Sequence, residues 1–185
     1  MLEEDLFAIV DEALKPLGSI LDDGEEFREP PLDILRFYHR SVRLHWVPLL
    51  GRASSVVAVA RQPVDLSFSA EGCRQLLRRL AMATNSRYPP WRHPRSGVSI
   101  GLTALILTPE PIGPEDDSTL KSVCTNLPRV RAVPLGVIRV NLGQEAMSFA
   151  LSRGPADLFP EPATLADALI PHLRRFVPML DEEGA

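Results

Sequence analysis

The sequence predicts an α/β domain in which helices flank a mixed β-sheet of about five strands. Residues 56–60 (VVAVA) and 98–107 (VSIGLTALIL) are apolar runs without polar alternation, which is typical of strands covered on both faces. Segments with helical spacing alternate with the predicted strands, as in layered α/β proteins. A chain of 185 residues, 45 % of them hydrophobic, is long enough for one domain with a substantial core.

Residues 1–29 are predicted to form an acidic arm, and residues 30–185 a single α/β domain. The arm begins with a predicted helix over 2–14, whose apolar residues recur at helical spacing. Residues 22–26 (DDGEE) indicate a solvated acidic turn. Because the helix has an apolar stripe, we expect it to dock on the domain and to bring its acidic side chains close to arginines of residues 34–95.

The next part of the chain predicts a short helix over 32–40 and then a hairpin. Residues 41–49 alternate between apolar and polar side chains, as a half-buried strand does. A turn at Gly51 and Arg52 leads into the strand at 56–60, which is expected to be central in the sheet. We therefore expect one hairpin here, followed by a turn at Pro63.

The second half of the chain predicts three helices, a central strand and a second hairpin. Ser69 is suited to cap a helix over 70–83, and residues 85–95, with three prolines, indicate a long surface loop. Residues 98–107 form the other central strand, and a helix is expected over 114–127. The second hairpin spans 130–141 and 145–152. Thr164 is predicted to cap a last helix that Pro171 kinks or splits.

A weak internal pseudo-repeat relates two strand exits. Residues 61–66 (RQPVDL) and 153–158 (RGPADL) share arginine, proline, aspartate and leucine at the same spacing. One interpretation is a pair of equivalent turns that face a ligand. The alternative is that two strand exits end in the same way, or that the similarity is chance, because proline ends a ladder and aspartate accepts bonds from nearby N–H groups.

Charge is distributed unevenly along the chain. Residues 1–33 carry 11 acidic and 2 basic side chains, whereas residues 34–95 carry 2 acidic and 11 basic ones. Arginine outnumbers lysine by 18 to 2, which indicates a GC-rich, bacterial genome. Recognition of phosphate by arginine is the alternative explanation.

The best candidate binding site lies in the proline-rich loop after residue 86. Its arginines offer planar donor forks, its aromatic rings offer stacking surfaces and its histidine can titrate, so the set suits a phosphate, a nucleotide or an acidic peptide. The alternative is that the aromatic rings hold the loop on the domain while the arginines are solvated. The candidate ligand-binding residues are Arg87, Tyr88, Trp91, Arg92, His93 and Arg95.

The sequence contains no catalytic signature that we can identify. It has no Walker A motif, nucleophile elbow, dinucleotide fingerprint or HExxH motif, and no catalytic residue, metal ligand set or cofactor is predicted. Cys73 and Cys124 have no partner spacing and are expected to be buried free thiols. The chain opens without a signal-peptide pattern and has no apolar run of ~18 residues, so a cytoplasmic location without membrane contact is expected.

These observations favour a non-enzymatic protein-binding or scaffold module of a bacterial cytoplasm, which binds a protein partner or self-associates as a homodimer. Two alternatives remain open. One is the binding of an anionic ligand or a nucleic acid through the basic segment 34–95 and its arginine-rich, aromatic loop. The other is an enzyme whose site is assembled from scattered residues.

Overall fold

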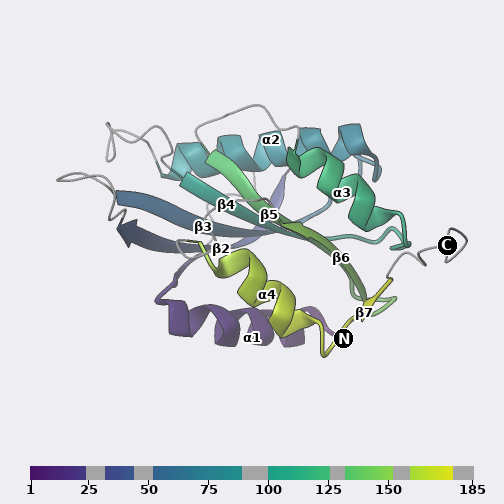
Figure 1. Cartoon of the computed structure of the whole chain (residues 1–185), viewed down its shortest axis with the longest axis horizontal. Helices are drawn as coiled ribbons and strands as arrows, with labels where there is room; N and C mark the ends of the chain where they lie inside the picture. The colour runs from purple at the N-terminus through teal and green to yellow at the C-terminus, as the bar shows by residue number, and fades with distance from the viewer. Residues whose placement is uncertain (24–31, 44–51, 89–99, 126–131, 152–158, 177–185) are drawn as a thin grey trace, which may run out of the picture.

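The computed structural model describes residues 1–23, 32–43, 52–88, 100–125, 132–151 and 159–176. A mixed β-sheet forms the middle layer, with two helices on each face (Figure 1). The helices are α1 (Glu3–Leu14), α2 (Ala70–Arg87), α3 (Asp116–Thr125) and α4 (Glu161–Leu169), and a 3₁₀ turn (Lys15–Leu17) follows α1. The predicted fold class is therefore confirmed.

Within the described residues the sheet has seven strands, and they lie side by side in chain order. The middle strands β3, β4 and β5 are parallel; β2 pairs antiparallel with β3, and β6 with β5. The outer strands β1 and β7 pair with β2 and β6 respectively. The strands are β1 (Ile20–Asp23), β2 (Asp33–Arg43), β3 (Arg52–Arg61), β4 (Ile100–Leu107), β5 (Ala132–Asn141), β6 (Ala146–Leu151) and β7 (Arg174–Arg175).

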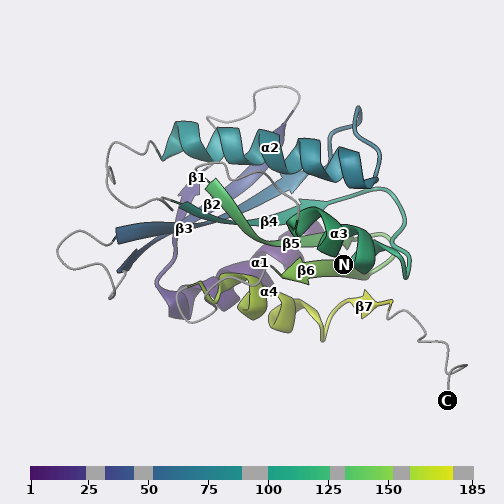
Figure 2. The ribbon, with the colours of Figure 1, turned by 45° about the horizontal axis from the view of Figure 1, so that its top comes forward.

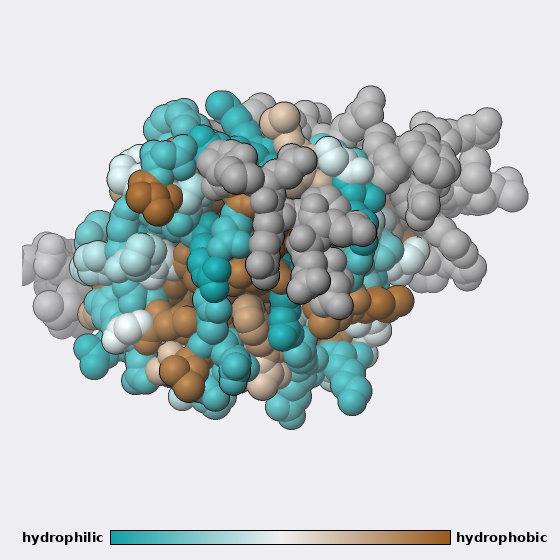
Figure 3. All heavy atoms as spheres, turned by 180° about the vertical axis from the view of Figure 1, so that it is seen from behind, coloured by the Kyte–Doolittle hydropathy of each residue, from teal (hydrophilic) through white to brown (hydrophobic). Residues whose placement is uncertain are grey.

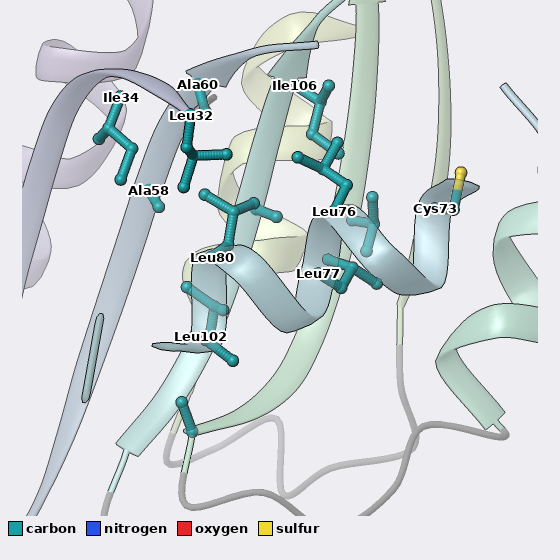
Figure 4. Packing of buried hydrophobic residues seen from close by; sticks show 14 of the residues in the cluster. Leu32, Ile34, Ala58, Ala60, Cys73, Leu76, Leu77, Leu80, Leu102 and Ile106 are labelled. Carbon is teal, nitrogen blue, oxygen red and sulfur yellow. The ribbon is translucent and has the colours of Figure 1, made fainter. Parts of the chain in front are cut away.

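The face covered by α2 and α3 buries the larger core. Parallel strands need crossover connections, and here α2 and α3 provide them on the same face. Leu76, Leu77 and Leu80 of α2 point toward the strands, where Ala58 and Leu102 lie opposite them (Figure 4). Ser69 caps α2 as predicted, because its Oγ accepts a hydrogen bond of 3.0 Å from the N–H of Gly72.

The opposite face is covered by α1 and α4, which lie side by side beneath the sheet (Figure 2). Leu6, Val10 and Leu14 of α1 are buried against β3, β4 and β5, together with Leu165 and Leu169 of α4. The predicted docking of helix 2–14 is therefore confirmed. The two apolar runs predicted to be covered on both faces supply buried residues to the core, among them Val57, Val59, Leu102, Leu105 and Ile106.

The predicted helix over 32–40 is wrong, because residues 33–40 belong to strand β2. The pairing of β2 with β3 shifts register between Ile34 and Arg36, which leaves Leu35 as an extra residue. The shift places Ile34 and Phe37, three positions apart, on the same face of the sheet. A spacing of three is also a helical spacing, so the bulge gave a strand the apolar pattern of a helix.

Other boundaries also differ from the prediction. The acidic residues Asp22 and Asp23 end strand β1 instead of forming a turn, which adds an edge strand to the sheet. Helix α2 continues through Arg87, so residues 85–87 are helical and not part of a loop. Helix α4 begins at Glu161, with Pro162 in its first turn, and Thr164 lies inside it. It ends at Leu169, before Pro171.

Only the first copy of the pseudo-repeat falls within the described residues. After β3, Asp65 accepts a hydrogen bond of 3.0 Å from Arg79 of α2. Residues 153–158 lie outside the described residues, so the interpretation of the two strand exits as equivalent turns stays a prediction. Among the helices that the structure describes, none is both long and apolar enough to span a membrane.

Candidate functional site

The first two residues of the predicted site lie where α2 ends. Arg87 is the last residue of α2, and Tyr88 follows it as the cap. Both bind Asp22 of β1: Arg87 donates from Nε at 3.0 Å and from Nη2 at 2.6 Å, and the Tyr88 hydroxyl donates at 2.9 Å. A bidentate arginine–carboxylate pair has a fixed geometry. These contacts therefore fasten the end of α2 to the edge of the sheet.

The ring of Tyr88 continues this cluster onto β2 and β3. It stacks on the imidazole of His39, with 4.7 Å between ring centroids, and meets the edge of Phe37. His39 Nε2 lies 3.2 Å from the Oγ of Ser54. The two residues predicted from sequence are thus joined by Asp22, His39 and Ser54, which the sequence analysis did not include, and we call these five residues the α2-end cluster.

These contacts shift the pKa values of Asp22 and Tyr88 in the α2-end cluster. The hydrogen bonds from Arg87 hold the pKa of Asp22 below its ordinary value. Burial raises the pKa of the Tyr88 hydroxyl above its ordinary value, and the adjacent carboxylate of Asp22 raises it further. Asp22 is therefore ionised at neutral pH, and Tyr88 keeps its proton as a hydrogen-bond donor.

A serine hydroxyl beside a histidine ring has the composition of a nucleophile and its base. Ser54, however, is only 3 % exposed and lies within β3, between β2 and β4. A substrate has no access to such a hydroxyl while the sheet is intact. In the part of the chain that the structure describes, the Ser54–His39 pair thus acts as an internal hydrogen bond.

The other predicted site residues cannot be placed. Trp91, Arg92, His93 and Arg95 lie outside the described residues, so their role in ligand binding stays a prediction. Arg87 and Tyr88 fit the alternative interpretation, in which an aromatic ring holds the segment on the domain. The partners of Tyr88 come from β1, β2 and α2, and no sequence spacing connects these elements.

A second polar cluster lies at the carboxyl ends of β3, β4 and β5. Ligands of α/β proteins bind at this end of a parallel sheet, so its contents bear directly on function. Glu110, after β4, accepts hydrogen bonds from Gln62 Nε2 at 2.9 Å and from the Phe68 N–H at 2.8 Å. Gln62 in turn accepts a bond of 2.7 Å from the Thr108 hydroxyl.

Arg139 of β5 is the centre of this second cluster. It is 1 % exposed, pairs with Asp116 of α3 and Glu110, and its guanidinium lies 3.7 Å from the centroid of the Phe68 ring. Burial raises the pKa of Asp116 and lowers the pKa of Arg139, because both charged forms lose water. We call Gln62, Phe68, Thr108, Glu110, Asp116 and Arg139 the carboxyl-end network.

Among the described residues, the carboxyl-end network leaves little room for a ligand in the hollow beside it. The hollow beside it, lined by Gln62, Phe68, Cys73 and Arg139 among others, has a volume of about 10 Å³. That volume is enough for about one water molecule. Burial raises the pKa of the Cys73 thiol to about 11, so this thiol is an unreactive neighbour of the network.

Comparisons with known proteins found no matching family, no similar curated protein and no similar solved structure.

Proposed function

We propose that this chain is a non-enzymatic module that binds another protein. The observation that carries the proposal is the carboxyl-end network, in which the polar groups bind one another where an α/β enzyme would bind its substrate. A hollow of about 10 Å³ admits no metabolite. A surface that binds a macromolecule needs no such pocket, and the bacterial, cytoplasmic setting inferred from composition stays part of the proposal.

The binding of anions or nucleic acids by segment 34–95 is the second candidate, and the contacts of its arginines weigh against it. Within the described part of the segment, six arginines pair with carboxylates of the same chain: Arg36, Arg40, Arg61, Arg74, Arg79 and Arg87. A phosphate would have to displace those carboxylates. The positive charge of these six arginines is thus matched within the molecule.

The proposal is tested by giving the full chain both kinds of ligand. A panel of nucleotides, sugar phosphates, amino acids and organic acids is screened by thermal shift, and a random peptide library on phage is panned against the same protein. We expect peptide binders and no metabolite that raises the Tm. A metabolite that raises the Tm of the wild type, but not of the Arg139→Met variant, would overturn the proposal in favour of an enzyme or a metabolite-binding protein.

A further inference from the structure

Three polar side chains of the described interior have atoms without a hydrogen-bond partner. Seen from behind, the molecule shows hydrophilic residues around the apolar ones in the middle of the face, and surface water satisfies such groups (Figure 3). Ser55, Thr103 and Glu161 are instead only 2 %, 0 % and 1 % exposed. Their atoms Oγ, Oγ1 and Oε2, respectively, bind no other described residue. Buried polar atoms are normally bound by protein or by ordered water, so these three need a partner.

The register of the sheet places the two hydroxyl groups close together. Ser55 of β3 pairs with Gly101 of β4, and Thr103 pairs with Val57. Side chains alternate between the two faces along a strand, and Val57 and Leu105 belong to the core beneath α1 and α4. Ser55 and Thr103 each precede one of these residues by two positions. They therefore face α1 and α4 as well, as diagonal neighbours on adjacent strands.

The start of α4 brings a carboxylate to the same part of the sheet. Arg40 of β2 pairs with Ser55 in antiparallel register, so the two side chains share a face. The Nε of Arg40 donates a hydrogen bond of 2.7 Å to Oε1 of Glu161, the first residue of α4. Glu161 is thus held beside Ser55 by its first oxygen, while its second oxygen, Oε2, is buried without a described partner.

Two glycines let the start of α4 approach the strands closely. Gly136 of β5 pairs with Thr103, and a Cβ at Gly136 would lie 2.7 Å from the Cβ of Pro162. A Cβ at Gly101 would lie 3.0 Å from the ring of Phe159. Apolar side chains at the start of α4 therefore cover this part of the sheet. The three unpartnered oxygens lie beneath that cover, out of reach of bulk water.

The charges beside the three oxygens determine which ligand suits them. A cation would lie near the guanidinium of Arg40 and an anion near the carboxylate of Glu161, so each would meet a like charge. An apolar ligand would leave the oxygens unsatisfied. Water is neutral and both donates and accepts, so it suits a carboxylate oxygen and two hydroxyl groups. A buried water makes about three hydrogen bonds, the number that these oxygens offer.

We propose that ordered water, bound by Ser55, Thr103 and Glu161, connects the start of α4 to strands β3 and β4. This water is part of the folded structure, so the inference goes beyond the proposed protein-binding function and does not depend on it. By supplying hydrogen bonds to three buried oxygens, the water stabilises the docking of α4 on the sheet.

The first test is a crystal structure of the full chain at a resolution that shows ordered water. We expect a water peak within hydrogen-bond distance of at least two of the three oxygens. Crystals soaked in rubidium bromide distinguish water from an ion, because rubidium and bromide both scatter anomalously. An anomalous peak at this place, or a map in which the three oxygens have no solvent neighbour, would overturn the inference.

The second test uses the sign of a change in stability. Thr103→Val keeps the shape of the side chain and removes the hydroxyl. If water is bound there, the Tm should fall by about 2–4 °C, because the water loses a partner. A Tm equal to that of the wild type, or above it, would show that the hydroxyl was unsatisfied and would overturn the inference. Oxygen-17 relaxation dispersion detects long-lived water in solution, and its signal should fall in Ser55→Ala/Thr103→Val.

The matched control is Thr84→Val. Thr84 is also a fully buried threonine, but its Oγ1 already donates a hydrogen bond of 2.8 Å to the carbonyl oxygen of Leu80. Removal of this hydroxyl should therefore leave the signal of long-lived water unchanged. An equal fall of that signal in the control and in Ser55→Ala/Thr103→Val would show that the water is lost for another reason, and would overturn the inference.

Discussion

Arg139 is one of the most deeply buried charged side chains that the structure describes. Its guanidinium is withdrawn from water, and its Nε is a buried donor with no hydrogen-bond partner among the described residues. Burial disfavours the charged forms of both Arg139 and Asp116. The pair therefore adds little net stability, and its main effect is to hold α3 and the loop after β4 in position. Removal of one partner leaves the other charge buried and uncompensated.

The variant Arg139→Met should therefore lower the free energy of unfolding by about 3–5 kcal/mol. Replacement of both members of the buried pair, in Arg139→Met/Asp116→Leu, should recover most of this loss, because the remaining carboxylate, Glu110, is partly exposed to water. Urea unfolding measures both. The control is Arg175→Met, which breaks the more exposed pair with Asp117 and should cost ~0–1 kcal/mol. An Arg139→Met cost no larger than the control would contradict the prediction.

Asp22 makes a pH-dependent contribution whose sign follows from its contacts. Its pKa is lower in the folded chain than in the unfolded chain, because Arg87 hydrogen-bonds to the ionised form. The resulting stability is present above the unfolded pKa of ~4 and is lost as the pH falls through the folded value.

The variant Asp22→Asn should therefore lose about 1–2 kcal/mol of stability at about pH 7, through weakened bonds to Arg87 and Tyr88. The difference from the wild type should shrink as the pH falls from the unfolded pKa of ~4 through the lower folded value, where the wild-type carboxyl takes up a proton. Thermal unfolding of both proteins across this pH range measures the difference in stability. Exposed Glu4→Gln serves as the control, and an Asp22→Asn penalty that stays constant down to low pH would contradict the assignment.

At the scale of the element, the prediction from sequence agrees best with the structure where the apolar residues of a helix or strand follow a regular pattern. Helices α1 and α2 and strand β4 were predictable because their apolar periods are regular and, for α2, because Ser69 marks the start. Strand β2 was not predictable, because the bulge at Leu35 shifts the side-chain period within the strand. Strand β1 carries two acids in four residues, so only its pairing with β2 reveals it.

The candidate site was less predictable than the fold. Arg87 and Tyr88 were found because adjacent charge and aromatic character in one loop is visible in the sequence. Their partners Asp22, His39 and Ser54 come from three different strands, and Asp22 is 65 residues away from Arg87. Such a cluster depends on strand order, which no local pattern specifies.

Helix α1 provides a test of the predicted boundary between an arm and a domain. Leu6 is fully buried against the sheet and α4, so Leu6→Ala should cost about 2–5 kcal/mol, as cavities in cores do. Leu2→Ala, at an exposed position on the same helix end, should change stability by less than about 0.5 kcal/mol. Chemical denaturation measures both. Similar, small effects of the two changes would support a detachable arm.

At the scale of the whole molecule, ion pairs among the described residues join the acidic start of the chain to the basic segment that follows. Glu3 pairs with Arg61, Asp11 with Arg36 and Asp22 with Arg87. Exposed pairs contribute little stability each, ~0–1 kcal/mol, and the apolar stripe of α1 provides most of the docking energy. The acids nevertheless cover arginines that would otherwise attract anions.

Neutralisation of these three acids, by Glu3→Gln/Asp11→Asn/Asp22→Asn, should strengthen retention on heparin at low salt. The gain should fade between about 50 mM and about 500 mM salt, since screening shortens the reach of exposed charges. The control Glu4→Gln/Glu12→Gln/Glu115→Gln makes the same change in net charge at exposed acids. Equal retention of the two variants would show that net charge, and not the uncovering of arginines, is responsible.

The position of α1 also has a consequence for how the molecule is made. Leu6, Val10 and Leu14 are synthesised well before Leu165 and Leu169, which complete their apolar surroundings. At roughly 5–20 residues per second, an apolar helix face waits on the order of ten seconds or more for its cover. During that interval the growing chain exposes an apolar surface of the kind that chaperones recognise, and α1 is fully enclosed only once α4 has been made.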